Sequence, residues 1–145
     1  MPVVDASVVI DWISPEASAG LPAVRLFNRL ATEGARLLGP RLLLKEVSNA
    51  LVSGIRRKRW SGAAADASHT LLLQLPVRIA DDYRDLVRAW ELARRYDNHP
   101  LYDMVYVALA ERTRTELITG DEALRRRLAH LGWVIGLEVE GITTP

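Results

Sequence analysis

The chain has 145 residues, of which 49% are hydrophobic and 26% are charged, and its formal net charge is +1. This length and composition predict one globular domain over residues 1–145, and the near-neutral charge excludes a general affinity for nucleic acids or membranes. The absence of cysteine excludes disulfides, thiol nucleophiles and cysteine-bound zinc. No apolar run is long enough to span a membrane and no basic leader precedes the first strand-like run, so we expect a soluble, cytoplasmic protein.

Short apolar segments alternate with longer segments of helical periodicity along the chain. The predicted strands are residues 2–5, 36–38, 76–79, 116–119 and 133–137. The predicted helices are residues 21–33, 40–60, 63–75, 81–95, 101–112 and 123–131. Residues 8–13 continue the opening apolar run as far as Ser14-Pro15. The alternation predicts right-handed β-α-β units, and therefore a three-layer α/β domain around a short-stranded parallel sheet.

Helical spacing also predicts which side chains pack in the core. In the helix over residues 40–60, the expected core stripe is Leu44, Val47, Leu51 and Ile55. In the helix over residues 81–95, the candidate packing residues are Tyr83, Leu86, Val87, Trp90 and Leu92. The segment Leu101–Ala110 is apolar nearly all round, which predicts a buried helix.

Asp5 interrupts the opening apolar run, where an unpaired charge in a buried strand is unfavourable. The charge is tolerable if the strand ends at Asp5 and the carboxylate emerges at the carboxyl edge of a parallel sheet, where ligands gather. A structural alternative is that Asp5 or Ser7 only caps the following helix. The residues alone leave both interpretations open.

Three later acids are candidates for the same edge of the sheet. Glu46 shares a helix face with Asn49 and Ser53, although a polar stripe of this kind is usually only the solvated side. Asp103 lies near the start of the apolar helix, where the helix dipole alone can hold it. Asp121 follows a predicted strand, where it can equally cap the next helix.

Carboxylates that meet at one crevice repel one another, by roughly 4 kcal/mol for two of them about 4 Å apart at an effective dielectric of about 20. Four such groups must raise their pKa values or take up a cation. Oxygen ligands without a cysteine or histidine cluster favour Mg²⁺ or Mn²⁺ over zinc. Such an ion suits phosphodiester cleavage, because it lowers the pKa of a bound water and stabilises the leaving oxygen.

The order of four motifs resembles the PIN domain, and more narrowly the VapC-type toxins of type II toxin–antitoxin modules. The motifs are Asp5-Ala6-Ser7, Glu46-Val47-Ser48-Asn49-Ala50-Leu51, Tyr102-Asp103-Met104-Val105-Tyr106-Val107-Ala108-Leu109-Ala110 and Thr119-Gly120-Asp121. Each motif is weak alone, but the four in this order are specific and cover essentially the whole chain. The resemblance implies a three-layer α/β/α PIN-like domain.

The resemblance also implies a metal-dependent endoribonuclease that acts as a toxin and cleaves RNA phosphodiester bonds with a metal-activated water. The catalytic acids that it implies are Asp5, Glu46, Asp103 and Asp121. Of these, Asp5 and Asp103 would bind Mg²⁺ or Mn²⁺ directly. Polar groups that often line the pocket in the family match Ser7, Asn49 and Thr119. The implied partners are the RNA substrate, a cognate antitoxin that obstructs the pocket, and a second copy in a homodimer.

Two other classes of protein remain open from the sequence. A receiver-like regulatory domain also uses an acidic Mg²⁺ pocket, but it needs a strand-end Lys, and none follows Asp121. A non-catalytic interaction module would not need all four acids. The phosphate-binding, dinucleotide-binding and serine-nucleophile motifs are absent, which argues against nucleotide hydrolysis, redox chemistry and serine hydrolysis.

Two basic clusters are candidate RNA contacts, although both can equally be solvated helix ends. In Arg56–Arg59, Arg57 lies eleven residues beyond Glu46 and returns to nearly the same helix face, which makes it the better candidate. The second cluster is Arg125–Arg127. Without ligand or catalytic spacing, the histidines are predicted to be surface or loop residues: His69, His99 and His130.

Overall fold

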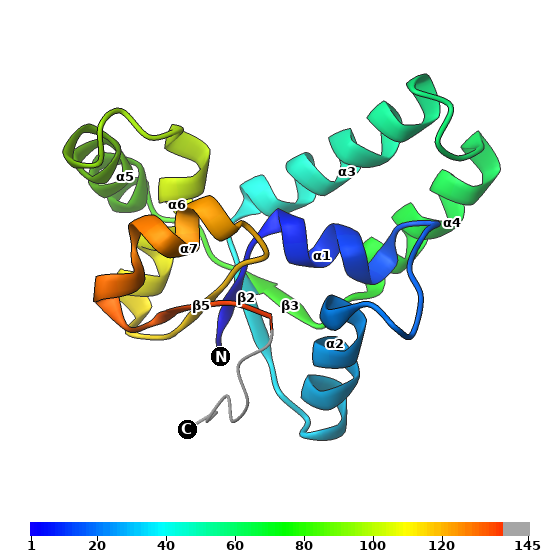
Figure 1. Ribbon diagram of the computed structural model, residues 1–145, viewed down its shortest axis with the longest axis horizontal. Helices are drawn as coiled ribbons and strands as arrows, with labels where there is room; N and C mark the ends of the chain where they lie inside the picture. The colour runs from blue at the N-terminus through cyan, green and yellow to red at the C-terminus, as the bar shows by residue number, and fades with distance from the viewer. Residues whose placement is uncertain (138–145) are drawn as a thin grey trace.

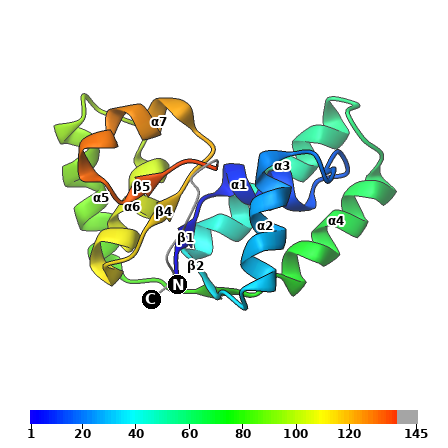
Figure 2. The ribbon, with the colours of Figure 1, turned by 60° about the horizontal axis from the view of Figure 1, so that its bottom comes forward.

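The computed structural model describes residues 1–137, so that residues 138–145 of the predicted domain lie outside the described part. Within residues 1–137, a five-stranded parallel sheet is flanked by helices in the predicted three-layer α/β/α arrangement (Figures 1 and 2). The strands are β1 (Val3–Val4), β2 (Leu37–Gly39), β3 (Val77–Ile79), β4 (Leu117–Ile118) and β5 (Val134–Ile135). The helices are α1 (Ala6–Ile13), α2 (Pro22–Thr32), α3 (Arg41–Arg56), α4 (Gly62–Gln74), α5 (Tyr83–Arg95), α6 (Leu101–Thr113), α7 (Glu122–Arg127) and the 3-10 helix η1 (Ala129–Leu131). None of the helices in this range has the length and apolar character needed to cross a membrane.

The strand order places β1 at the centre of the sheet, with β2 and β3 on one side and β4 and β5 on the other. The order therefore reverses between β1 and β4, and ligand sites of open α/β sheets form outside the carboxyl ends of the strands at such a switch point. Val4 pairs with Ile118, and the next residue, Asp5, donates its backbone N–H to the carbonyl of Ile118 at 3.2 Å. The ends of β1 and β4 thus lie side by side.

The helices form two groups about the sheet (Figure 1). On one side α3 and α4 run along each other, and α1 packs against both of them and against α2. On the other side α5 packs along α6, which lies against β1 and β4. Met104 and the segment 106–110 of α6 are buried, which confirms the prediction of a buried helix. Because α6 runs antiparallel to the strands, its first turn lies at the carboxyl edge of the sheet.

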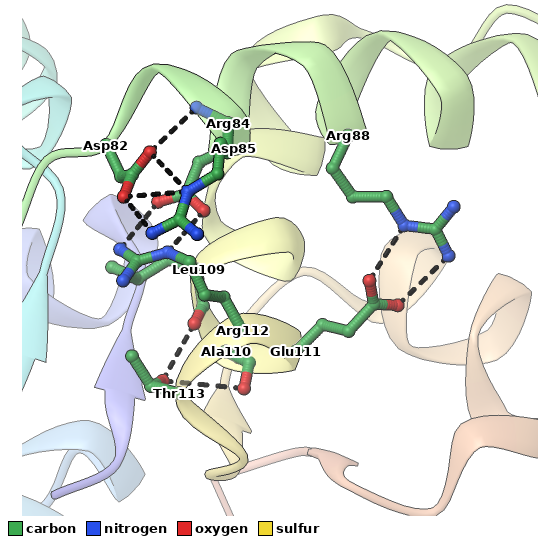
Figure 3. A network of polar contacts seen from close by, with 9 residues as sticks. All are labelled: Asp82, Arg84, Asp85, Arg88, Leu109, Ala110, Glu111, Arg112 and Thr113. Carbon is green, nitrogen blue, oxygen red and sulfur yellow. Dashed lines mark hydrogen bonds and ion pairs between the residues drawn. The ribbon is translucent and has the colours of Figure 1, made fainter.

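Ion pairs hold α5 and α6 in register (Figure 3). Arg112 binds both oxygens of Asp85, at 2.7 and 2.9 Å, and Asp85 is buried. Arg88 binds both oxygens of Glu111, at 2.7 and 3.1 Å. Bidentate contacts of this kind are strong because both groups are charged and the geometry is fixed. They steady the helix that carries Asp103.

The segment after Asp5 is one to which the sequence analysis assigns neither a strand nor a helix. The apolar residues 8–13 form most of α1, and the opening strand ends after Val4. The buried residues of α1 recur at helical rather than strand spacing: Ala6, Val8, Val9, Trp12 and Ile13. At the other end of the chain, the predicted helix over residues 123–131 divides into α7 and η1, and the last strand is limited to β5.

The outer face of α5 contradicts the packing predicted for this helix. Of the predicted packing residues, only Leu92 is buried. The other four are exposed: Tyr83, Leu86, Val87 and Trp90. The buried face instead carries Asp85, which is neutralised by Arg112, and the small side chain of Ala89. Both helix faces have apolar residues at helical spacing, so periodicity alone does not say which face is buried.

In α3 the core stripe also differs from the predicted one. The buried residues are Leu43, Val47, Leu51 and Gly54, whereas Leu44 is half-buried and Ile55 is exposed. A Cβ added to Gly54 would lie 2.1 Å from the ring of Trp60. This indole folds back over the helix and donates its N–H to the carbonyl of Leu51 at 3.0 Å. Glycine is therefore required where Trp60 covers the helix.

Candidate active site

Asp5 occupies the junction between β1 and α1. Its side-chain Oδ1 accepts the backbone N–H of Val8 at 3.3 Å, which makes Asp5 the N-cap of α1. The residue is only 7% exposed. Asp5 is therefore both a strand-end residue at the carboxyl edge of the sheet and a helix cap, and the two interpretations drawn from the sequence do not exclude each other.

Two hydroxyl groups hold the carboxylate of Asp5 at the junction of β1 and β4. Ser7 Oγ donates to Asp5 Oδ1 at 2.5 Å and accepts the backbone N–H of Gly120 at 3.1 Å. Thr119 Oγ1 donates to Asp5 Oδ2 and accepts the backbone N–H of Asp121 at 3.0 Å. Each hydroxyl thus connects the end of β1 to the loop that follows β4.

Asp121 begins α7, as the capping interpretation predicts. Its Oδ1 accepts the backbone N–H groups of Ala123 and Leu124 at 3.0 and 3.1 Å. Its own backbone N–H is bound to Thr119, the same hydroxyl that binds Asp5. Asp121 therefore lies at the same edge as Asp5, but one of its carboxylate oxygens is engaged by the helix.

Glu46 comes to the site from α3 and is held by a side chain of α6. Its Oε1 accepts the phenolic O–H of Tyr106 at 2.6 Å. Burial raises the pKa of Tyr106, and the hydrogen-bonded Glu46 and the charges of Asp5 and Asp103 raise it further. The phenol therefore stays protonated and acts as a fixed donor. The charges of Asp5 and Asp103 thus act on the same hydroxyl that Glu46 accepts.

Asp103 lies in the first turn of α6, where the helix dipole favours a carboxylate. Its Oδ2 is 2.7 Å from Nε2 of His99, which precedes it by four residues. The side chain of Asp103 is 34% exposed. One carboxylate oxygen of Asp103 is thus held by the protein while the group remains open to solvent.

The predicted acids lack an arginine or lysine partner in the part of the chain that the structure describes. Within residues 1–137, no Arg or Lys forms an ion pair with any of the four, which are Asp5, Glu46, Asp103 and Asp121. The buried Asp85, by contrast, is paired with Arg112. Burial raises the pKa of Asp5, hydrogen bonds from Ser7, Thr119 and Val8 lower it in part, and the charge of Asp103 raises it again. Within residues 1–137, no arginine or lysine thus compensates the negative charge of this edge, a condition that attracts a cation.

This donor set fits a hard divalent cation that takes few protein ligands. Within residues 1–137, no group of three or more His, Asp or Glu side chains is arranged to hold a metal ion. Mg²⁺ does not require such a group, because it keeps several waters and binds through one or two carboxylates plus substrate phosphates. Asp5 and Asp103 are the two acids that the family resemblance assigns to the metal, and the charge of Asp103 raises the pKa of Asp5.

The two basic clusters differ in how far internal contacts engage them. In the second cluster each guanidinium has a partner: Glu122 for Arg125, the Glu122 carbonyl for Arg126, and the Tyr96 carbonyl for Arg127. Arg57, the C-cap of α3, is exposed, and its side chain makes no hydrogen bond or ion pair within the described part of the chain. Arg57 is therefore the better placed of the candidates to contact a phosphate.

His99 and Tyr106 are the site contacts that the sequence analysis does not identify. His99 lies in the loop between α5 and α6, as predicted, but its side chain is only 9% exposed and binds Asp103. The sequence feature that could have identified His99 is its position four residues before Asp103, on the other side of Pro100, the N-cap of α6. Tyr106 lies inside a motif that carries the family resemblance, yet nothing in the sequence shows that it reaches Glu46.

A cavity of about 1050 Å³ lies away from these acids, beside residues that precede β1, β4 and β5. Its charged lining residues are Arg78, Asp81, Glu111, Arg112, Arg114 and Glu116. Arginines and carboxylates balance there, and three of the charges are already paired with Arg41, Arg88 and Asp85. The cavity therefore lacks the uncompensated charge that distinguishes the acidic edge.

Acidic side chains at the switch point of a parallel sheet are typical of α/β proteins that bind a ligand at the carboxyl ends of their strands. The family model of the PIN domain matches residues 3–128, and the chain belongs to the PIN domain family. PIN domains are generally metal-dependent nucleases, which favours the nuclease interpretation over a receiver-like domain. No curated protein matches the chain.

Proposed function

We propose that this protein is a Mg²⁺- or Mn²⁺-dependent endoribonuclease and the VapC-type toxin of a type II toxin–antitoxin module. Membership of the PIN family supports the nuclease class. The observation that carries the proposal is the acidic edge itself, where hydrogen-bond donors hold the carboxylates without an Arg or Lys partner in residues 1–137. The side chains that supply these donors are Ser7, His99, Tyr106 and Thr119.

In this proposal Asp5 and Asp103 hold the ion. When bound, the ion lowers the pKa of a water and polarises the scissile phosphate. Glu46 and Asp121 complete the acidic edge and accept the proton of the attacking water. Ser7 and Thr119 fix the orientation of the Asp5 carboxylate, so that little reorganisation is needed when substrate arrives.

The substrate class that we propose is single-stranded or looped RNA lying along α3. This helix carries Glu46 at the acidic edge and Arg57 at its far end, about 16 Å away for a rise of about 1.5 Å per residue. An arginine without an internal partner can bind the phosphate backbone while the scissile phosphate lies at the acids. The near-neutral net charge of the chain is compatible with this arrangement, because only a local contact is required.

Cleavage of a labelled RNA by the purified protein tests the proposal. We expect cleavage in Mg²⁺ or Mn²⁺, none in excess EDTA, and a loss of at least about 100-fold in Asp5→Asn and Asp103→Asn. Asp66→Asn, an exposed carboxylate on α4, is the matched control and should cleave at the wild-type rate. Wild-type rates in both site variants would refute the assignment of these two residues.

The toxin role is tested in cells. Expression should arrest growth, and Asp5→Asn should abolish the arrest. A short reading frame immediately upstream, with a DNA-binding start and an amphipathic tail, is the expected antitoxin gene, and its product should inhibit cleavage when added to the purified protein. Such activity implies a cytoplasmic protein. Unimpaired growth of cells that express the wild-type protein would contradict the toxin role. The nuclease activity would then be judged by the RNA cleavage assay alone.

We also propose a homodimer formed through the outer face of α5. This face exposes apolar side chains that are separated by helical spacing: Tyr83, Leu86, Val87 and Trp90. Exposed apolar patches of this kind mark interaction sites. Tyr102, which precedes Asp103 in the first turn of α6, is also exposed and lines a pocket together with Tyr83 and Leu86. The wild type should sediment as a dimer, and Trp90→Glu should sediment as a folded monomer; a monomeric wild type would contradict this assignment.

A further inference from the structure

His99 links Asp103 to Arg127 through both nitrogens of its imidazole ring. Its Nε2 is 2.7 Å from Asp103 Oδ2, and its Nδ1 is 2.9 Å from Arg127 Nη1. The same Nη1 of Arg127 donates to the carbonyl of Tyr96 at 2.7 Å. The side chain of His99 is only 9% exposed. The three side chains therefore form a continuous line from α7 through the α5–α6 loop to the acidic edge.

The contact with Arg127 determines where the imidazole carries its hydrogen. A guanidinium group has only N–H donors, so Nδ1 of His99 must be the acceptor in this contact. The hydrogen of the neutral ring is then on Nε2, which faces the carboxylate of Asp103. In this form His99 donates its Nε2–H to Oδ2 of Asp103.

The backbone around His99 is shaped to bring the ring to this position. Asp97 and Asn98 both adopt left-handed conformations, with φ of 58° and 56°, which reverse the chain after α5. The backbone N–H of His99 then donates to the carbonyl of Ala93 at 3.2 Å. Pro100 follows as the N-cap of α6, so His99 lies one helical turn before Asp103.

We propose that His99 is a positioning residue for Asp103, and that Arg127 holds His99 in the Nε2–H form. The inference rests on the proposed function, because it assigns these residues to the support of a carboxylate that binds the divalent cation. A neutral donor fixes one oxygen of Asp103 and leaves the charge of the group available, whereas a direct arginine contact would compensate that charge. Arg127 accordingly serves the site from within the protein and is not an RNA contact.

The first test is made on the metal-free protein and does not depend on activity. Long-range ¹H–¹⁵N correlation spectra of histidine-labelled protein should show His99 as the Nε2–H tautomer in the wild type. Arg127→Met should convert His99 to a mixture of tautomers, while His69 and His130 are unchanged. A wild-type His99 with its hydrogen on Nδ1, or a tautomer indifferent to Arg127→Met, would overturn the role of Arg127.

The second test measures Mn²⁺ affinity by electron paramagnetic resonance and the steady-state kinetics of RNA cleavage. His99→Ala should weaken Mn²⁺ binding by about 10–100-fold and lower kcat, with the KM for RNA unchanged. His99→Gln, whose amide N–H can replace the Nε2 donor, should recover most of the affinity. His69→Ala, an exposed histidine on α4, is the matched control and should bind Mn²⁺ as the wild type does.

Equal Mn²⁺ affinity in wild type, His99→Ala and His99→Gln would overturn the proposal, as would equal weakening in both His99 variants. Circular dichroism and unfolding curves show whether His99→Ala is folded. If it is not, the Mn²⁺ affinities of His99→Gln and Arg127→Met are compared instead, and the proposal predicts weaker binding in Arg127→Met than in His99→Gln. If the wild type binds no Mn²⁺ and cleaves no RNA, the proposed function fails together with the positioning role. The tautomer of His99 still reports separately on its contact with Arg127.

Discussion

Replacement of Asp5 by asparagine should stabilise the metal-free protein at neutral pH even though it abolishes activity. Burial raises the pKa of Asp5 in the folded state, and hydrogen bonds from Ser7, Thr119 and Val8 offset only part of this effect. Because burial opposes the ionised form of Asp5, Asp5→Asn should raise the unfolding free energy at neutral pH. The asparagine Oδ1 can still accept from Ser7 and Val8, so the cap of α1 is retained.

The sign of the pH dependence follows from the direction of the pKa shift. A carboxyl group with a raised pKa contributes stability below its unfolded value of about 3.9, and this contribution is lost as the pH rises through the folded value. The difference between Asp5→Asn and wild type should therefore be small near pH 4 and grow toward neutrality. Urea unfolding in EDTA, followed by tryptophan fluorescence between about pH 4.5 and pH 8, measures it, with Asp66→Asn as the exposed control. A variant that is less stable than wild type at pH 7, or a pH-independent difference, would refute the reasoning.

Three further substitutions test separate parts of the structure. Tyr106→Phe removes the hydrogen bond to Glu46, so it should lower the unfolding free energy by about 1 kcal/mol and kcat by about tenfold; an unchanged kcat would show that Glu46 needs no support. Gly54→Ala should destabilise by about 1–3 kcal/mol in urea unfolding, because the added Cβ would lie 2.1 Å from Trp60, although alanine is otherwise the better helix former; a more stable variant would contradict this packing. Arg57→Gln should weaken RNA binding and reduce the slope of log affinity against log salt concentration by about 1, and an unchanged slope would exclude a phosphate contact.

The features that could be predicted from the sequence are those that depend on local pattern. The alternation of short apolar segments with helices predicts the parallel sheet, and the uniformly apolar segment around Tyr106 predicts a buried helix. The position of Asp5 at the carboxyl edge follows from a carboxylate that ends an apolar strand. Its second role as the cap of α1 also follows from local pattern, because a cap is satisfied by the next three residues.

The features that could not be predicted depend on contacts between distant segments. Periodicity does not tell that α5 turns Asp85 inward and Trp90 outward, because that choice depends on Arg112, a residue of the next helix. The role of His99 depends on Arg127, which is 28 residues away in the sequence. The residues after Asp5 are apolar at every position that a strand or a buried helix would need, so their sequence alone does not distinguish the two.

The most direct test of the acidic site is the position of a bound ion. Crystals of the protein soaked with Mn²⁺ should show an anomalous difference peak between the carboxylates of Asp5 and Asp103, and this peak should be absent in Asp103→Asn. A peak held by other residues, or none at a Mn²⁺ concentration that supports RNA cleavage, would contradict the assignment of these two carboxylates to the metal.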